Sequence, residues 1–201
     1  MRGLAVPRWP KSDGDTASSV LDVAERLVQV RGFNGFSYAD VAAELQLSKA
    51  ALHYHFAGKA ELGEVLLLRY SQRFASALET IESETLDGPG KLAAYANLYL
   101  DVLRQDRMCL CGMIAAEYQT LPEPMQAVVV QFFIDNEAWL GRVLEQGIAE
   151  GTVYTSGTTQ DAARSIVACL EGAMLVARPF HDITRFQAAS AAMIAGLLAS
   201  S

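Results

Sequence analysis

Apolar residues recur at three- and four-residue spacing along the chain, and this pattern restricts its fold more than any other feature. The first such stripe comprises Val20, Leu21, Ala24, Leu27 and Val28. Thr16 before it is a suitable helix cap, and Gly32 after it would end the helix. This spacing is typical of an amphipathic helix. No strand pattern persists anywhere. We therefore predict an all-α fold, with further helices at about 37–45, 49–56, 59–82, 91–104, 109–121, 125–150, 160–177 and 184–199.

Breaker residues suggest the segments between these helices. Three Pro or Gly residues precede Asp13, so we expect residues 1–14 to form a flexible arm. Residues 87–90, with the sequence DGPG, are the clearest loop signal.

Composition indicates a folded chain in a reducing compartment. The 201 residues are 51% hydrophobic and 19% charged, which is typical of a globular protein. The most apolar stretch, 166–177, contains Glu171 and is too short to span a membrane. We see no signal peptide. The three cysteines form no disulfide framework, and we expect a cytoplasmic protein.

Charge is unevenly distributed. Residues 1–70 carry eight basic and eight acidic side chains, whereas residues 71–201 carry eight and fifteen, which accounts for the net charge of −7. Because a protein that binds a polyanion keeps acids away from the contact surface, only the N-terminal third is suited to nucleic acid. An ordinary acidic protein with a neutral segment is the alternative on charge alone.

Two short predicted helices, joined by a turn at 46–48, resemble a helix-turn-helix supported by the first helix. Ser48 is a suitable N-cap for the second helix of the pair, and Phe56 is expected to be buried. The side chains that would reach a major groove or its phosphates are Lys49, Ala50, His53, Tyr54 and His55. Lys59 opens the next helix, whose N-terminus could bind a phosphate.

The segment FSYADVAAELQLSKAALHYHFAGKAEL resembles the DNA-binding part of the TetR family of transcriptional regulators. The resemblance runs from about residue 16 to residue 67. It rests on Ala24-Glu25-Arg26-Leu27, Gly32-Phe33, Ser48-Lys49, Tyr54-His55-Phe56 and Lys59-x-Glu61-Leu62, which occur in this order at the family's spacing.

This resemblance implies a role for each matching residue. Ser37 and Tyr38 would touch the DNA backbone, and Ser48 would begin the recognition helix. Lys49, Ala50 and His53 would face bases or nearby phosphates, while Tyr54, His55 and Lys59 would anchor phosphates.

Two positions depart from the family pattern. Gln46 stands where the turn usually has Gly, and a left-handed Gln there would cost about 1 kcal/mol. His53 stands where the family usually has Tyr, and a purely structural role for it is the alternative. His53 and His55 point about 200° apart on a helix, so we expect no metal site and no cofactor.

The last two predicted helices are rich in small residues, which allow helices to approach closely. Apolar residues run nearly all round both helices, so more than one face is expected to be buried. This pattern, like the TetR resemblance, implies a twofold homodimer through a four-helix bundle. A monomer with a very apolar core is the alternative. The expected domains are the arm at 1–14, a helix-turn-helix DNA-binding domain at 15–62 and an effector-binding and dimerisation domain at 63–201.

The middle helices are expected to hold a pocket for a small apolar or aromatic effector. The candidate lining residues are Cys109, Met113, Tyr118, Phe132, Phe133, Trp139 and Met174. Each could equally fill the core. Glu117 and Arg178 could orient a polar group of the effector, or could be surface charges.

The TetR resemblance implies a repressor that binds a pseudo-palindromic DNA operator as a dimer and is released by the effector. Two other functions remain open. Cys109 and Cys111 lie at a predicted helix start after Arg107, where a thiolate would be stabilised, so the chain could sense oxidants or electrophiles. A helical adaptor that binds protein is the other alternative. No catalytic motif is present, and we expect no enzymatic activity.

Overall fold

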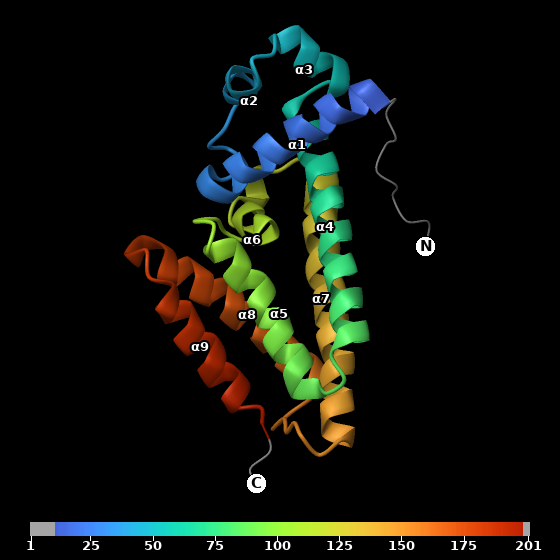
Figure 1. Cartoon of the computed structure of the whole chain (residues 1–201), viewed down its shortest axis with the longest axis vertical. Coiled ribbons are helices and arrows are strands. Elements are labelled where there is room, and N and C mark those ends of the chain that lie inside the picture. The colour runs from blue at the N-terminus through green and yellow to red at the C-terminus, as the bar shows by residue number, and fades with distance from the viewer. Residues whose placement is uncertain (1–10, 199–201) are drawn as a thin grey trace. The chain divides into compact units, whose positions relative to one another are not determined.

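The computed structural model describes residues 11–198, with side chains described from residue 15 onward. Its helices are α1 (Lys11–Arg31), α2 (Tyr38–Leu45), α3 (Lys49–His55), α4 (Lys59–Glu84), α5 (Gly88–Leu103), α6 (Leu110–Ala115), α7 (Glu123–Ala149), α8 (Thr159–Ala177) and α9 (Ile183–Ala195), with short 3-10 helices η1 (Tyr118–Thr120) and η2 (Arg178–Phe180) (Figure 1). Within residues 11–198 the only extended pairing is an isolated bridge between Val153 and Leu198. The all-α prediction is confirmed.

The chain folds into two compact units. The N-terminal unit comprises the described residues up to Arg73 together with Leu110–Val130, and the C-terminal unit comprises Phe74–Cys109 together with the described residues from Gln131 onward. The domain boundary expected after residue 62 falls inside α4, a helix that continues to Glu84.

The N-terminal unit is built around the apolar face of α1. Helices α2, α3 and α6 all pack against α1. The predicted stripe is buried, and the residues of this face are Ala17, Val20, Leu21, Ala24, Leu27 and Val28. Full burial of a Val or Leu side chain stabilises a fold by about 1.5–3 kcal/mol, so this face is the main source of cohesion in the unit.

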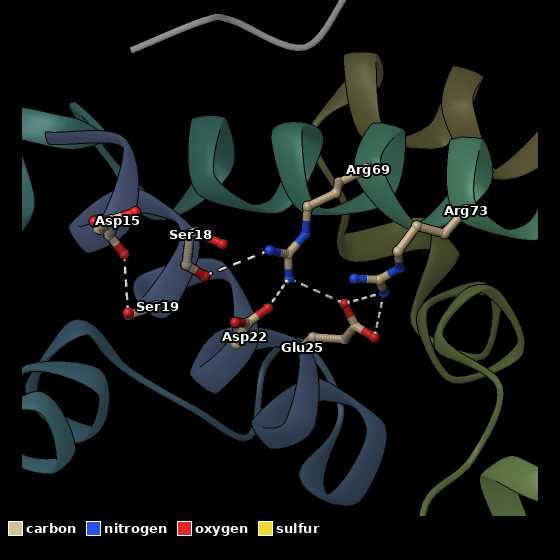
Figure 2. A network of polar contacts seen from close by, with 7 residues as sticks. All are labelled: Asp15, Ser18, Ser19, Asp22, Glu25, Arg69 and Arg73. Carbon is tan, nitrogen blue, oxygen red and sulfur yellow. Dashed lines mark hydrogen bonds and ion pairs between the residues drawn. The ribbon is translucent and has the colours of Figure 1, made fainter. Parts of the chain in front are cut away.

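Polar contacts also join α1 to α4 (Figure 2). The Arg69 guanidinium lies 2.7 Å from the Asp22 carboxylate and 3.2 Å from that of Glu25, and it also donates to the Ser18 carbonyl oxygen. Arg73, one turn further along α4, donates to both oxygens of Glu25 at 2.6 and 2.5 Å. Glu25 therefore receives two arginines from α4, which fixes the register of α4 along α1.

Helix α1 begins earlier than expected, because residues 11–14 are helical and do not belong to a flexible arm. The rest of the predicted arm, residues 1–10, lies outside the described residues.

Two other predicted boundaries were wrong. Residues 88–90 are not a loop, because α5 begins at Gly88: Asp87 caps it by accepting from the Gly90 N–H at 2.7 Å, and Pro89 occupies its first turn. The helix expected at 109–121 ends at Ala115. The Glu117 N–H donates to the carbonyl oxygen of Ile114, three residues back, at 3.0 Å. This spacing is that of a 3-10 turn, so the α-helical pattern ends here.

In the C-terminal unit α8 and α9 lie side by side, and α5 packs against both (Figure 1). Helices α5 and α7 approach closely at two glycines, since a Cβ on Gly88 would lie 2.8 Å from the Gly147 Cα. The core of this unit contains the buried aromatic side chains of α5, α7 and α9, which are Tyr95, Tyr99, Phe132, Trp139 and Phe186.

The left-handed turn after α2 generates a first prediction. Gln46 has φ 55° and ψ 36°, and its side chain is exposed. Because glycine adopts this conformation without a Cβ penalty, Gln46→Gly should raise the free energy of unfolding by up to about 1 kcal/mol in urea titrations. Gln46→Ala, which keeps the Cβ, is the control and should give no gain. Equal stability of the two variants would contradict the account.

Candidate functional site

Helices α2 and α3 are each fixed at their start by a side-chain cap. The Ser37 hydroxyl accepts from the Asp40 N–H, and the Asp40 carboxylate accepts from the Ser37 N–H at 2.7 Å, which completes a capping box. The Ser48 hydroxyl accepts from the Ala51 N–H at 3.1 Å. The predicted start of the third helix is confirmed, and α3 begins at Lys49.

The inner side of α3 is anchored by two fully buried residues, Leu52 within it and Phe56 directly after it, and the burial of Phe56 was predicted. The outer side carries Lys49, Ala50, His53 and Tyr54, all exposed, and the Tyr54 side chain is 75% exposed. An aromatic residue this exposed contributes little to the fold, so its position on the outside of a short helix suits contact with a partner.

Tyr38 and His53 support each other at the edge of this face. Their ring centroids lie 5.0 Å apart. The Tyr38 hydroxyl donates to the Phe56 carbonyl oxygen at 3.1 Å, and a ring nitrogen of His53, Nδ1, lies 3.1 Å from the Ala57 carbonyl oxygen. Burial, reinforced by the Glu61 carboxylate, raises the pKa of Tyr38 to about 12, so its hydroxyl stays a donor at neutral pH.

His55 lies on the other flank of α3 and is half-buried. Its ring meets Tyr54 edge-on at 5.2 Å, and its Nδ1 has no hydrogen-bond partner among the described residues. No group of three or more His, Cys, Asp or Glu side chains that could hold a metal ion is found between residues 11 and 198.

Lys59, at the start of α4, is held inside the N-terminal unit. Its ammonium donates to the Phe36 carbonyl oxygen at 2.6 Å and lies 4.7 Å and 4.5 Å from the ring centroids of Phe33 and Phe36. Burial lowers the pKa of Lys59, and the Glu117 and Asp40 carboxylates oppose this shift. Lys59 therefore holds the loop before α2 through its contacts with Phe33 and Phe36.

The arginines of the first 70 residues that lie in the described part of the chain are all engaged with acids. Arg26 pairs with Glu44, Arg31 with Asp40, and Arg69 with Asp22 and Glu25. Lys49, by contrast, lies exposed at the first position of α3. Among the described side chains of the first 70 residues, the positive charge exposed to a polyanion is thus concentrated on α3.

Glu117 is a residue whose role the sequence did not reveal. Its carboxylate accepts from the Phe33 N–H at 2.6 Å and from the Asn34 N–H at 3.1 Å, and the Asn34 amide donates to the Thr120 hydroxyl at 2.8 Å. Gly32, with φ 83°, makes room, because a Cβ there would lie 2.8 Å from Glu117 Oε1. Glu117 thereby holds the segment that leads from α1 to the capped start of α2.

The predicted effector residues are divided between the two units. Cys109, Phe132, Trp139 and Met174 are buried in the C-terminal unit, where Phe133 is half-buried against Phe132. Met113 and Tyr118 belong to the N-terminal unit.

Sequence reasoning missed a buried polar group in the C-terminal core. The Tyr95 and Tyr99 hydroxyls lie 3.0 Å apart, and Tyr95 donates to the Asn136 side-chain oxygen at 3.0 Å. Burial raises the pKa of both tyrosines above the ordinary value. The Tyr95 ring is stacked on Trp139 at 5.6 Å. The i, i+4 spacing of the tyrosines on one helix was the signal that could have found them.

The two candidate sensing cysteines are both buried, Cys109 with 2% and Cys111 with 0% of its surface exposed. The Cys109 thiol hydrogen bonds to the Glu171 carboxyl group. A neighbouring carboxylate disfavours the thiolate that reacts with electrophiles.

None of the helices in the described residues is both long and apolar enough to cross a membrane.

A capped helix-turn-helix with an exposed second helix, joined to an all-helical unit, defines a helix-turn-helix transcriptional regulator. Residues 20–66 match the family model described as "Bacterial regulatory proteins, tetR family", and residues 88–193 match "Tetracyclin repressor-like, C-terminal domain". The chain belongs to the TetR family of transcriptional regulators.

Similar proteins span nearly the same length. A TetR-family regulator from Agrobacterium tumefaciens is 31% identical with a TM-score of 0.90, covering 93% of this chain and 100% of its own. A TetR regulator from Legionella pneumophila is 29% identical with a TM-score of 0.83, and the match covers 90% of this chain and 97% of the Legionella chain. The uncharacterized regulator YxaF of Bacillus subtilis is 24% identical over 86% of this chain and 90% of its own.

The contacts of Glu117 generate a second prediction. Glu117→Ala leaves the Phe33 and Asn34 N–H groups without their acceptor and should lower the free energy of unfolding by about 1–3 kcal/mol in urea titrations. Hydrogen exchange of these two amides should accelerate. Glu79→Ala, which removes an exposed acid from α4, should leave both quantities unchanged. Unaltered exchange in Glu117→Ala would show that the carboxylate does not hold this segment.

Proposed function

We propose that this protein is a cytoplasmic, homodimeric transcriptional repressor that binds a pseudo-palindromic DNA operator and is released by a small effector. The proposal needs no catalytic step and no cofactor. It assigns operator binding to the N-terminal unit, and effector binding to the core of the C-terminal unit.

The observation that carries the proposal is the outer face of α3, where exposed donors stand on a helix that is capped and anchored from behind. Lys49 and His53 would donate to base edges or nearby phosphates beside Ala50. Tyr54, His55 and Lys59 would contact phosphates, as would Ser37, Tyr38 and Ser48 near the ends of α2 and α3. Lys59 would do so with an ammonium N–H left after its contact inside the unit, since an ammonium has three. The single hydroxyl proton of Tyr38 is donated to the Phe56 carbonyl oxygen, so Tyr38 would exchange that hydrogen bond for one to a phosphate.

Dimerisation is proposed through α8 and α9. On α8 the large apolar side chains of Leu175 and Val176 are 62% and 58% exposed. Side chains of this kind on adjacent positions are costly to leave in water and are suited to a second copy of the same surface. A twofold dimer would present two α3 helices to successive major grooves of an operator with matching symmetry.

Release would follow from a shift between two populations. An effector bound among the aromatic residues of the C-terminal core would favour an arrangement in which the two α3 helices no longer match the operator. Helix α4 is the element that would carry the change, because it belongs to both units.

The two alternatives have less support. A thiol sensor would need an accessible cysteine, whereas Cys109 and Cys111 are buried. A protein-binding adaptor would have no need of a capped helix-turn-helix with exposed Lys49.

DNA binding would be tested by selecting duplexes from a random pool with the full-length protein, followed by fluorescence anisotropy on the selected duplex across salt concentrations. A palindromic sequence should emerge, and binding should weaken steeply with salt. Lys49→Ala should weaken binding by roughly tenfold and reduce the salt slope by about one, because one phosphate or base contact is lost.

The control for Lys49→Ala is Arg142→Ala, which removes the same charge from an exposed position on α7 in the C-terminal unit. It should bind like the wild type. If no sequence were enriched, or if both variants lost affinity equally, the assignment of operator binding to α3 would fail.

The proposed interface yields a further prediction. Leu175→Glu places a charge on the apolar surface of α8 and should convert the dimer to a monomer in sedimentation velocity experiments. Leu86→Glu is the matched control, since Leu86 is 88% exposed in the turn before α5 and should tolerate the charge. A Leu175→Glu protein that sediments as the wild type would place the interface elsewhere.

A further inference from the structure

We propose that the effector site in the C-terminal core is built around the Glu171 carboxylate and takes an aromatic compound that carries an amine or another cationic hydrogen-bond donor. This inference rests on the proposed function in that it names the class of effector for the same core. It differs from the apolar or aromatic ligand expected from sequence, because a charged group becomes a requirement.

The carboxyl group of Glu171 is an incompletely paired polar group. It hydrogen bonds to the Cys109 thiol, and its Oε1 atom is fully enclosed but has no hydrogen-bond partner among the described residues. Buried acceptors without a donor are rare in folded proteins, because each loses its hydration without compensation. The residue as a whole is half-buried.

An aromatic cluster from α4, α5 and α7 lies in the same core. Tyr95 and Tyr99 from α5 are close enough to Glu171 for its charge to contribute to raising their pKa. Phe74 meets both tyrosine rings edge-on at 6.0 Å and Phe132 at 5.1 Å, while Trp139 is stacked on Tyr95. Faces of aromatic rings attract cations, and a carboxylate among them selects for positive charge.

Energetics favours a cationic donor over a neutral ligand. Burial raises the pKa of Glu171 to about 7, because the charged form is poorly solvated, and the hydrogen bond from Cys109 opposes this shift. Near neutral pH the group is therefore divided between its protonated and ionised forms. An ammonium donor would stabilise the ionised form and complete the hydrogen bonding of Oε1, which a neutral hydrocarbon cannot do.

This arrangement fixes the sign of the pH dependence. The titratable groups coupled to the cluster are Cys109, Tyr95, Tyr99 and Glu137, and both tyrosines have a pKa raised far above neutrality. Glu171 is then the group that ionises in the cluster as pH rises through about 7. Affinity for a cation should rise over the same range, with a proton released on binding below it.

The test uses two probes that share a naphthylmethyl group, the cationic naphthylmethylamine and the neutral naphthylmethanol. Each is titrated into the full-length protein by isothermal titration calorimetry without DNA. At about pH 8 the wild type should bind the amine at least about tenfold more tightly than the alcohol. At about pH 6 this preference should shrink, since less of Glu171 is ionised. Glu171→Gln, which keeps the shape of the side chain, should abolish both the preference and its pH dependence.

Glu145→Gln is the matched control, because it removes one acid from an exposed position on α7 and should preserve the preference. Equal affinity of the wild type for the two probes, or a preference that survives in Glu171→Gln, would overturn the inference. Operator binding of each variant is measured separately. A protein that binds its operator but does not distinguish the probes refutes this effector class alone, whereas a Glu171-dependent preference without DNA binding refutes the proposed repressor alone.

Discussion

The apolar face of α1 is the constraint on which the N-terminal unit depends. Helix α3 has only seven residues, and a helix of that length is not stable alone in water. It persists because Leu52 and the adjoining Phe56 are buried while α3 packs on α1. The exposed positions of α3 are therefore fixed by residues on its opposite side, and a loss of packing on α1 would displace them.

Much of the helix-turn-helix could be predicted from the sequence because its signals are local. The Ser37 and Ser48 caps each depend on residues three positions away, and the stripe on α1 repeats within single turns. The sequence left the conformation of Gln46 open, and the structure shows that it is left-handed. The individual DNA contacts of α3 remain predictions, because their partners lie outside the chain.

The features that the sequence did not reveal depend on distant or competing contacts. The Glu117 carboxylate accepts a hydrogen bond from the Phe33 N–H, 84 positions away in the sequence. No local sequence pattern near either residue predicts this contact. The bond from Tyr95 to Asn136 likewise joins separate helices. At Asp87 a local signal was misread: Gly-Pro-Gly suggests a loop, yet the carboxylate cap and the proline in the first turn favour a helix start.

The chain enters the N-terminal unit twice, because Leu110–Val130 returns to it after the first pass. This has a consequence for modular engineering. A chimera that joined residues 1–62 to the remainder of another regulator would discard Glu117 and would leave the Phe33 and Asn34 N–H groups without an acceptor. It would also lose Arg69 and Arg73, which both pair with Glu25. An exchangeable cassette of this protein must therefore carry two separate stretches of sequence.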